Sequence, residues 1–200
     1  MVEIGARLFA ERPFNDVWIE QVAQEAGVSR GLVYHYFPNK SDFFSAIVRH
    51  GMRHAFELTA PDTTLPPDKW LVDGVERLIH FVELNADAFR AVYAGRHSVD
   101  EDVRAAVRDN RDKQVGRICA LLSPDEPVSE TLRLGVEGWI AMLDAMLLEW
   151  LDGRRIERER LVKLACGSLV GTIVTAFSAD GKGEQIEQIR HLAPAVFGDR

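Results

Sequence analysis

The spacing of apolar residues constrains this 200-residue chain more than any other feature of its sequence. Apolar side chains recur at intervals of three and four residues in nearly every long segment, which is the period of a helix with one buried face. No run alternates apolar and polar residues over the length of a β-strand. Segments rich in proline, glycine and aspartate divide the pattern into about nine or ten helices. We therefore predict an all-α protein.

The clearest break in this pattern is the segment APDTTLPPD at residues 60–68. It follows a predicted helix over residues 39–58 and is too short to act as a flexible tether. We predict a small helical domain over residues 1–50 and a larger helical domain over residues 51–200. No internal repeat or low-complexity segment interrupts either part.

Charge and cysteine content exclude several classes of protein. The net charge of −7 argues against a surface that binds nucleic acid indiscriminately, so any such contact must be confined to a small area. Cys119 and Cys166 are far apart and have no histidine cluster near them, which gives neither a disulfide framework nor a zinc site. His97 lies near the start of the highly charged segment 95–113, where we expect a solvated helix rather than a metal site. We predict no metal and no cofactor.

The sequence lacks motifs for catalysis, export and membrane insertion. It contains no GxSxG, P-loop, HExxH or dinucleotide fingerprint, so we predict that the chain is not an enzyme. The first residues mix charged with apolar side chains, unlike a signal peptide. The longest weakly polar run, residues 168–179, is shorter than the roughly 20 residues that cross a bilayer. We expect a cytoplasmic protein with no membrane partner.

Residues 19–37 carry the plan of two short helices joined by a tight turn. The first helix has an apolar stripe at helical spacing from Ile19 to Ala26. Gly27 is expected to end that helix in the left-handed conformation, and Ser29 to cap the next. Val33 then faces the stripe of the first helix. This is the plan of a helix-turn-helix.

The segment from Ser29 to Ser41 combines cations and aromatic residues but contains no Asp or Glu. Taken alone, its tyrosines would suit a protein core, a ligand site or a surface. A plain solvated helix interleaves both signs of charge, so the joint pattern favours a surface for an anion. Arg30 has the geometry to pair with a guanine edge, and Lys40 at a helix start has the geometry to bind phosphate. The predicted DNA-contacting residues are Ser29, Arg30, Gly31, Tyr34, His35, Tyr36 and Lys40.

Three stretches carry a resemblance to a known family: Phe9–Arg12, Val22–Ser29, and Gly31–Phe37 followed by Lys40. Together they resemble the DNA-binding domain of the tetracycline-repressor (TetR) family over about residues 1–50. The resemblance implies a homodimeric transcriptional regulator, usually a repressor, whose helical C-terminal body binds a small effector.

Two departures from the family pattern stand out. Trp18 occupies a position where the family often has threonine, which caps the second helix and contacts phosphate. An indole N–H still donates to phosphate but cannot accept the bonds of a cap, so we include Trp18 among the predicted DNA contacts. Relatives also commonly carry a basic extension before the first helix, which here is expected to begin almost at Met1.

The resemblance further implies that the last two long helices of each subunit form a four-helix bundle in the dimer. Residues 128–151 and 161–177 offer two such helices with broad apolar bands. Their internal glycines each destabilise a helix by about 0.5–1 kcal/mol, and we attribute them to close helix approach across an interface. The predicted interface comprises Leu132, Gly135, Met146, Leu164, Gly167, Gly171 and Val174.

The rest of the larger domain is rich in big apolar residues, most of which we expect in its core. A cavity for a hydrophobic effector would need such residues around a few polar groups. His80, Asn85, Tyr93, Arg117 or Glu137 are candidates for those polar groups. The predicted effector-binding residues are Trp70, Val75, Leu78, Phe81, Val82, Phe89, Tyr93, Ile118, Trp139 and Met142.

The sequence thus predicts a ligand-responsive transcriptional regulator. It would bind double-stranded operator DNA as a homodimer, act as a repressor, and release the DNA when a small hydrophobic effector binds the C-terminal domain. The alternative is a helical small-molecule-binding protein with weakened or lost sequence-specific DNA binding, motivated by Trp18 and by the missing basic extension.

Overall fold

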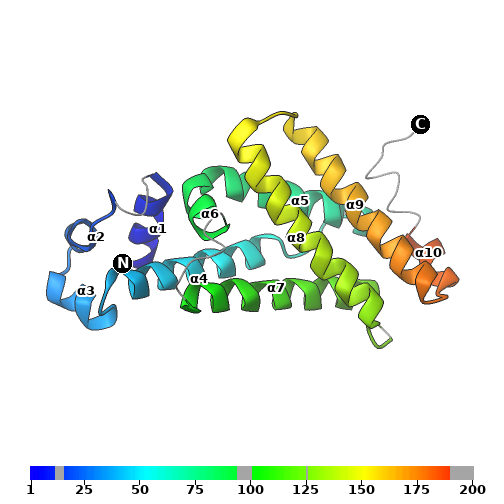
Figure 1. Cartoon of the computed structure of the whole chain (residues 1–200), viewed down its shortest axis with the longest axis horizontal. Helices are drawn as coiled ribbons and strands as arrows, with labels where there is room; N and C mark the ends of the chain where they lie inside the picture. Colours follow the sequence, from blue (N-terminus) through cyan, green and yellow to red (C-terminus); the bar gives the residue numbers. More distant parts are fainter. Residues whose placement is uncertain (12–15, 94–100, 125, 190–200) are drawn as a thin grey trace. The chain divides into compact units, whose positions relative to one another are not determined.

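The computed structural model describes residues 1–11, 16–93, 101–124 and 126–189, and it contains helices but no strand within these ranges (Figure 1). The predicted all-α fold and helix number are confirmed. Arg12 and His97 lie outside the described residues. The elements are α1 (Val2–Glu11), α2 (Ile19–Glu25), α3 (Arg30–Tyr36), α4 (Lys40–Leu58), the 3-10 helix η2 (Pro67–Lys69), α5 (Trp70–Leu84), α6 (Ala86–Tyr93), α7 (Glu101–Leu122), α8 (Glu130–Gly153), α9 (Arg158–Ala179) and α10 (Gly183–Ile189).

Contacts group the chain into two compact units. Unit 1 contains Met1–Glu57 and Phe81–Asn110, and unit 2 contains Leu58–His80 and Arg111–Arg200. Helices α4, α5 and α7 therefore contribute residues to both units. The boundary predicted at residue 50 separates an expected DNA-binding part from an expected effector-binding part. The contact grouping does not test this boundary, which stays a prediction.

The core of unit 1 is built where α1, α2, α3 and α4 meet. Phe9, Val22, Val33 and Phe43 are almost fully buried there. Gly5 allows α1 to approach α4, because a Cβ atom at this position would lie 2.5 Å from Cζ of Phe43. The small core thus fixes α2 and α3 against a long helix, which holds their outer face in one orientation.

Unit 2 is centred on the antiparallel pair α8 and α9, which lie side by side (Figure 1). Trp139 Nε1 of α8 donates to the Ala165 carbonyl of α9 at 2.9 Å, and Trp150 Nε1 donates to the Ile156 carbonyl, in the connection between the two helices, at 2.8 Å. Because buried N–H groups need acceptors, these bonds allow both tryptophans to pack inside the helix pair.

Helix α9 is, among the described residues, the one helix long and apolar enough to cross a membrane by length and composition. Residues 168–179, a run shorter than a bilayer span, are only part of it. Half of its apolar window is buried inside the chain, and α9 packs against α8. That burial is typical of a core helix in a helical domain.

Candidate nucleic-acid interface

The turn between α2 and α3 has the geometry predicted from its glycine. Gly27 adopts a φ of 64°, in the left-handed region. The Val28 N–H donates to the Ala23 carbonyl at 3.0 Å, and the Gly27 N–H donates to the Gln24 carbonyl at 3.2 Å, which together form a Schellman motif. The turn therefore ends α2 sharply, and α3 starts three residues after Gly27, at Arg30.

Helix α3 is oriented by one cap and one buried side chain. Ser29 Oγ accepts the Leu32 N–H at 3.1 Å, so the first turn of α3 is closed by its predicted cap. Val33 is fully buried. Phe37 follows the helix and packs edge-on against Phe43, with ring centroids 5.0 Å apart. These anchors leave the opposite side of α3 in solvent.

We call the exposed side of α3, with its capping residue, the recognition surface. All of its predicted members are exposed. Leu32, which the sequence analysis did not include, is also 40% exposed. An exposed apolar side chain on this helix has the chemistry to contact a thymine methyl group. The recognition surface comprises Ser29, Arg30, Gly31, Leu32, Tyr34, His35 and Tyr36.

Gly31 has no packing reason to be glycine. A Cβ atom built on it would meet only Ser29 Oγ, at 3.9 Å, which is ordinary contact. Glycine inside a helix destabilises it by about 0.5–1 kcal/mol relative to alanine. Its presence at the centre of the recognition surface suits a site where another molecule approaches the backbone closely.

Arg30 forms an ion pair with Glu20 of α2. Both side chains remain accessible, with 66% and 38% exposure respectively. The pair was not foreseen, because Glu20 precedes the acid-free segment and approaches Arg30 only through the fold. Exposed ion pairs of this kind contribute at most about 1 kcal/mol, so a guanine or phosphate competes for Arg30 readily.

Trp18 and Lys40 lie together beside the recognition surface. Trp18 is the N-cap of α2 but makes no side-chain cap bond; its backbone N–H instead donates to Gln21 Oε1 at 3.3 Å. Lys40 begins α4, where Asn39 Oδ1 accepts the Asp42 N–H at 2.9 Å as its spacing predicted. Partial burial lowers the pKa of Lys40, while the Asp16 carboxylate opposes that shift. A capped helix start with a lysine is a good phosphate site.

The predicted effector-binding residues are divided between the two units. In unit 1, the rings of Phe89 and Tyr93 stack at 4.4 Å. In unit 2, Trp70 Nε1 donates to the Leu65 carbonyl at 2.9 Å, and Trp139 is buried between α8 and α9. Unit 1 thus holds Phe81, Val82, Phe89 and Tyr93, whereas unit 2 holds Trp70, Val75, Leu78, Ile118, Trp139 and Met142. Their role in ligand binding stays a prediction.

Two sequence profiles match this chain. The profile "Bacterial regulatory proteins, tetR family" matches residues 2–47, which contain α1 to α3 and the start of α4. The profile "Tetracyclin repressor-like, C-terminal domain" matches residues 67–171, more than half of the chain. The chain belongs to the TetR family.

Similar proteins agree with this assignment. A TetR-family transcriptional regulator from Streptomyces coelicolor shares 27% identity and a TM-score of 0.82, over 94% of this chain and 85% of its own. The transcriptional activator FasR of Mycolicibacterium smegmatis is 23% identical over 168 residues, 80% of this chain and 74% of its own length. The transcriptional repressor AcnR of Corynebacterium glutamicum is 26% identical over 152 residues, 72% of this chain and 79% of its own.

Membership of the TetR family gives the coarse function. The protein is a DNA-binding transcriptional regulator and not an enzyme. The N-terminal match includes the whole of the turn between α2 and α3. The individual DNA contacts proposed for Trp18, Lys40 and the recognition surface stay predictions.

Proposed function

We propose that this TetR-family regulator is a repressor that binds operator DNA as a homodimer and releases it when a small hydrophobic effector binds the C-terminal domain. The recognition surface carries this proposal. Its side of α3 has no carboxylate of its own, is held outward by buried Val33, and has Lys40 at the next helix start. Such an arrangement supplies base contacts from Arg30 and a phosphate contact from Lys40.

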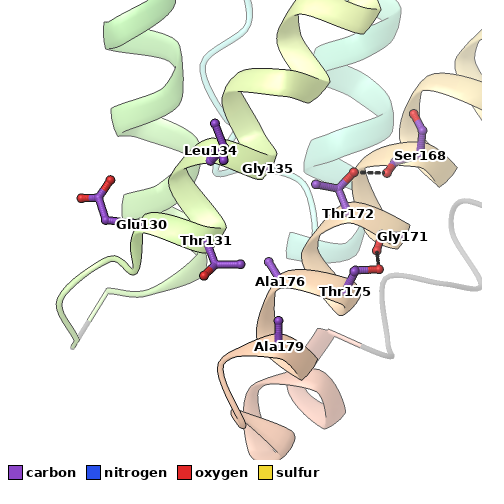
Figure 2. Close-up of a pocket in the computed structure, with 10 residues that line it drawn as sticks. All are labelled: Glu130, Thr131, Leu134, Gly135, Ser168, Gly171, Thr172, Thr175, Ala176 and Ala179. Atoms are coloured by element: carbon purple, nitrogen blue, oxygen red, sulfur yellow. Dashed lines mark hydrogen bonds between the residues drawn. The ribbon is translucent and has the colours of Figure 1, made fainter.

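The outer face of α8 and α9 supports the homodimer. It carries exposed apolar side chains, with Leu134 71%, Leu164 52% and Met142 37% exposed. A shallow groove runs between the two helices, with Gly135, Gly171 and Thr172 among its lining residues (Figure 2). Apolar faces of this kind are stabilised by a partner, and a two-fold dimer presents two copies of α3 to half-sites roughly 34 Å apart.

The glycines on this face have two different roles. A Cβ atom at Gly135 would lie 2.9 Å from Cγ2 of Thr172, so this glycine permits α8 to pack on α9 within one chain. At Gly138 and Gly171 an added Cβ would meet nothing within 4 Å. Close approach of a partner helix accounts for these two. Leu132 is fully buried in the chain, so exposed Leu134 replaces it in the interface that we propose.

Two threonine hydroxyls of the groove already have acceptors within their own helix. The Thr172 hydroxyl donates to the Ser168 carbonyl at 2.8 Å, and the Thr175 hydroxyl donates to the Gly171 carbonyl at 2.8 Å (Figure 2). Because both hydroxyls donate inside their own helix, a second subunit can cover them with little loss of hydrogen bonding.

A hydrophobic effector is favoured by the large apolar residues of the C-terminal domain. One relative, 22% identical over 173 residues, is named fatty acid metabolism regulator protein in Bacillus subtilis. That name fits the proposal that the effector has an apolar body. An effector acts by preferring the state in which the two α3 helices no longer match adjacent major grooves.

A mobility-shift titration tests the DNA-binding part of the proposal. The full-length protein is titrated with the DNA that flanks its own gene and with a shuffled fragment of equal length. We expect retardation of the flanking fragment alone, weakening steeply as salt rises. Equal, feeble binding to both fragments would instead identify a small-molecule-binding protein that has lost operator recognition.

Sedimentation analysis tests the dimer. The protein should sediment as a dimer at micromolar concentration, and Leu134→Glu combined with Leu164→Glu should give a folded monomer. A monomeric wild-type protein would refute the proposed interface, whatever the outcome of the DNA titration.

A further inference from the structure

The exposed side of α3 is divided into rows of different chemistry. Side chains four residues apart lie on the same side of a helix, because neighbouring residues are rotated by about 100°. Since Val33 is buried, Gly31 and His35 form the row that lies farthest from the core. Leu32 and Tyr36 form the row on one flank of it, which we call the apolar flank, and they are 40% and 62% exposed.

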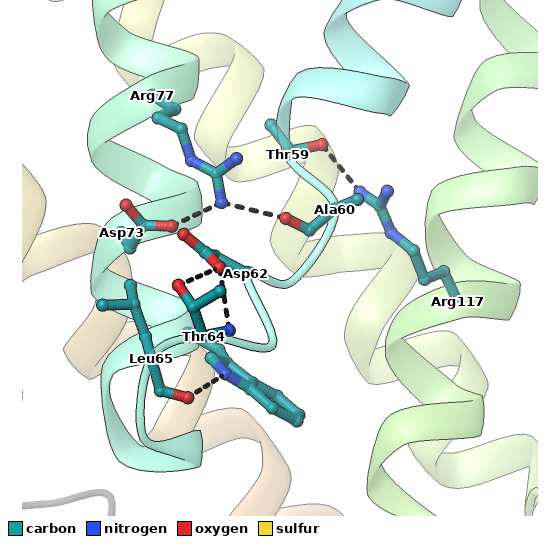
Figure 3. A network of polar contacts seen from close by, with 9 residues as sticks. Thr59, Ala60, Asp62, Thr64, Leu65, Asp73, Arg77 and Arg117 are labelled. Carbon is teal, nitrogen blue, oxygen red and sulfur yellow. Dashed lines mark hydrogen bonds and ion pairs between the residues drawn. The ribbon is translucent and has the colours of Figure 1, made fainter.

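The other flank of α3 carries hydrogen-bond donors. Arg30 and Tyr34 lie there, and their side chains are exposed. Arg77 and Arg117 of unit 2, by contrast, donate to residues 59–60 of their own chain at 2.9 and 2.6 Å (Figure 3). The donor flank thus suits hydrogen bonds to DNA, whereas the apolar flank offers few donors and suits a contact with an apolar group.

Exposed apolar side chains gather at this surface. In the described part of residues 1–57, the large apolar side chains that are exposed are Trp18, Leu32, Tyr34 and Tyr36. Leu32 is the one aliphatic residue among them. Single exposed leucines are common on protein surfaces, but a group of large apolar residues rimmed by polar ones indicates contact with another molecule.

The local structure determines where Leu32 stands. Its N–H donates to Ser29 Oγ at 3.1 Å, so Leu32 belongs to the capped first turn of α3. Its neighbour Gly31 has no side chain, and a Cβ atom built there would meet only Ser29 Oγ, at 3.9 Å. Because the middle row carries no side chain at this point, the flanking leucine can reach base edges when α3 enters the major groove.

We propose that Leu32 is a specificity-determining residue, which contacts the 5-methyl group of a thymine in each operator half-site. This methyl group is an apolar feature of the major groove, and it distinguishes thymine from cytosine. The proposal rests on the proposed function, in which α3 contacts operator DNA. It adds a requirement on the operator: each half-site contains a thymine whose methyl group contributes to affinity.

Contact of Leu32 with the sugar–phosphate backbone is the competing explanation. Such a contact would also be lost in Leu32→Ala, but it carries no base information. The two explanations differ in their response to deoxyuridine, which pairs like thymidine and lacks only the methyl group.

Fluorescence anisotropy measures the ratio of affinities for operator made with thymidine and operator made with deoxyuridine. The full-length protein is titrated with both, and with a shuffled fragment made with each nucleoside. We expect the thymidine operator to bind about fourfold more tightly for each contacted methyl group, the effect of burying one such group. Replacement of one thymidine at a time then locates the contacted base.

Variants assign the ratio to a side chain. At the located base, Leu32→Ala should reduce the ratio to near one, whereas Leu32→Met keeps an apolar side chain of similar size and should retain most of it. Leu84→Ala is the matched control, because it removes another exposed leucine of unit 1 outside the recognition surface, and it should leave the ratio unchanged. Because the ratio is taken within one variant, a change in stability does not obscure it.

Three outcomes would overturn the methyl contact. An unchanged ratio in Leu32→Ala would do so, and a ratio lost in Tyr36→Ala but kept in Leu32→Ala would assign the contact to Tyr36 instead. If the wild-type protein binds the thymidine and deoxyuridine operators equally, and both above shuffled DNA, operator recognition stands and the methyl contact is wrong. If it prefers neither operator to shuffled DNA, the proposed function is wrong and the methyl contact with it.

Discussion

Lys40 Nζ lies 5.8 Å from the centre of the Trp18 ring. Trp18 is the residue that departs from the family pattern, and it is 62% exposed beside the start of α4. An ammonium group near an indole face is attracted by the ring quadrupole. Trp18 makes no side-chain cap on α2, but its ring attracts the ammonium group of Lys40. This attraction favours a fixed position for the lysine that we expect to contact a DNA phosphate.

Replacing Trp18 with alanine should weaken operator binding by about two- to fivefold, since an exposed cation–π contact contributes about 0.5–1 kcal/mol. Trp18→Phe keeps an aromatic face and should lose less. Fluorescence anisotropy with operator and shuffled DNA measures both variants. Because phosphate contacts carry no sequence information, the loss should be similar on both fragments. Identical affinities for the alanine and phenylalanine variants would show that the ring does not position Lys40.

Glu20→Gln should increase operator affinity, because it frees Arg30 from an ion pair that DNA must otherwise displace. We expect a gain of up to about fivefold, the amount that one exposed pair allows. Arg30→Ala should have the opposite effect and relax base preference, with a loss of about 1–3 kcal/mol on the operator alone. The double variant should bind like Arg30→Ala. A further gain from Glu20→Gln in the absence of Arg30 would show that Glu20 repels DNA directly.

Gly31→Ala should separate stability from function. The substitution should stabilise the fold by about 0.5–1 kcal/mol, because alanine is the better helix former and the added methyl group meets no close neighbour. Operator binding should fall, since the methyl group stands where the DNA is expected to approach the backbone. Urea unfolding measures the first effect and anisotropy the second. Unchanged operator affinity would remove Gly31 from the recognition surface.

Features that depend on neighbours in sequence were predictable. The left-handed Gly27, the Ser29 cap and the Asn39 cap follow from local backbone chemistry, and each was expected. The ion pair of Arg30 with Glu20 was not, because it depends on how α2 and α3 cross. Apolar periodicity fixes which face of a helix is buried, but it does not identify the side chain that meets a given charge.

The glycines of α8 show the same limit. From the sequence, Gly135 and Gly138 are both attributed to a close approach between subunits. In the structure a Cβ atom at Gly135 would contact Thr172 of the same chain, whereas one at Gly138 would meet nothing within 4 Å. Glycine in a helix signals that a neighbour is close, but only the packing identifies which neighbour it is.

Alanine at these two positions should therefore affect different properties, folding at Gly135 and dimer formation at Gly138. Gly135→Ala should destabilise the chain, since its methyl group would lie 2.9 Å from Cγ2 of Thr172 and force α8 from α9. Gly138→Ala should leave the fold intact but weaken the dimer. Urea unfolding and sedimentation measure these outcomes. Gly135→Ala with Thr172→Ser is the control, because removal of the Thr172 methyl should restore most of the stability. A dimer unaffected by Gly138→Ala would exclude that glycine from the interface.

The two cysteines should be unreactive until the protein unfolds. Both are buried, and burial raises the pKa of Cys166 from 9.0 to about 12. In the unfolded chain the thiol ionises near pH 9, so between about pH 9 and 12 the unfolded state binds fewer protons than the folded state. The free energy of unfolding should therefore fall as pH rises through this interval, and the contribution of Cys166 should be complete below it.

Ellman's reagent measures how accessible the thiol is in Cys119→Ala, the variant that leaves Cys166 as the single thiol. At pH 8 the rate of labelling should equal the rate at which the protein unfolds in urea, because the reagent needs an accessible thiolate. Cys166→Ala, unfolded in parallel, should lose less stability between pH 9 and 11 than the variant that retains Cys166. Rapid labelling of folded protein at pH 8 would mean that α9 opens locally, and that the packing of α8 on α9 is weaker than its buried tryptophans indicate.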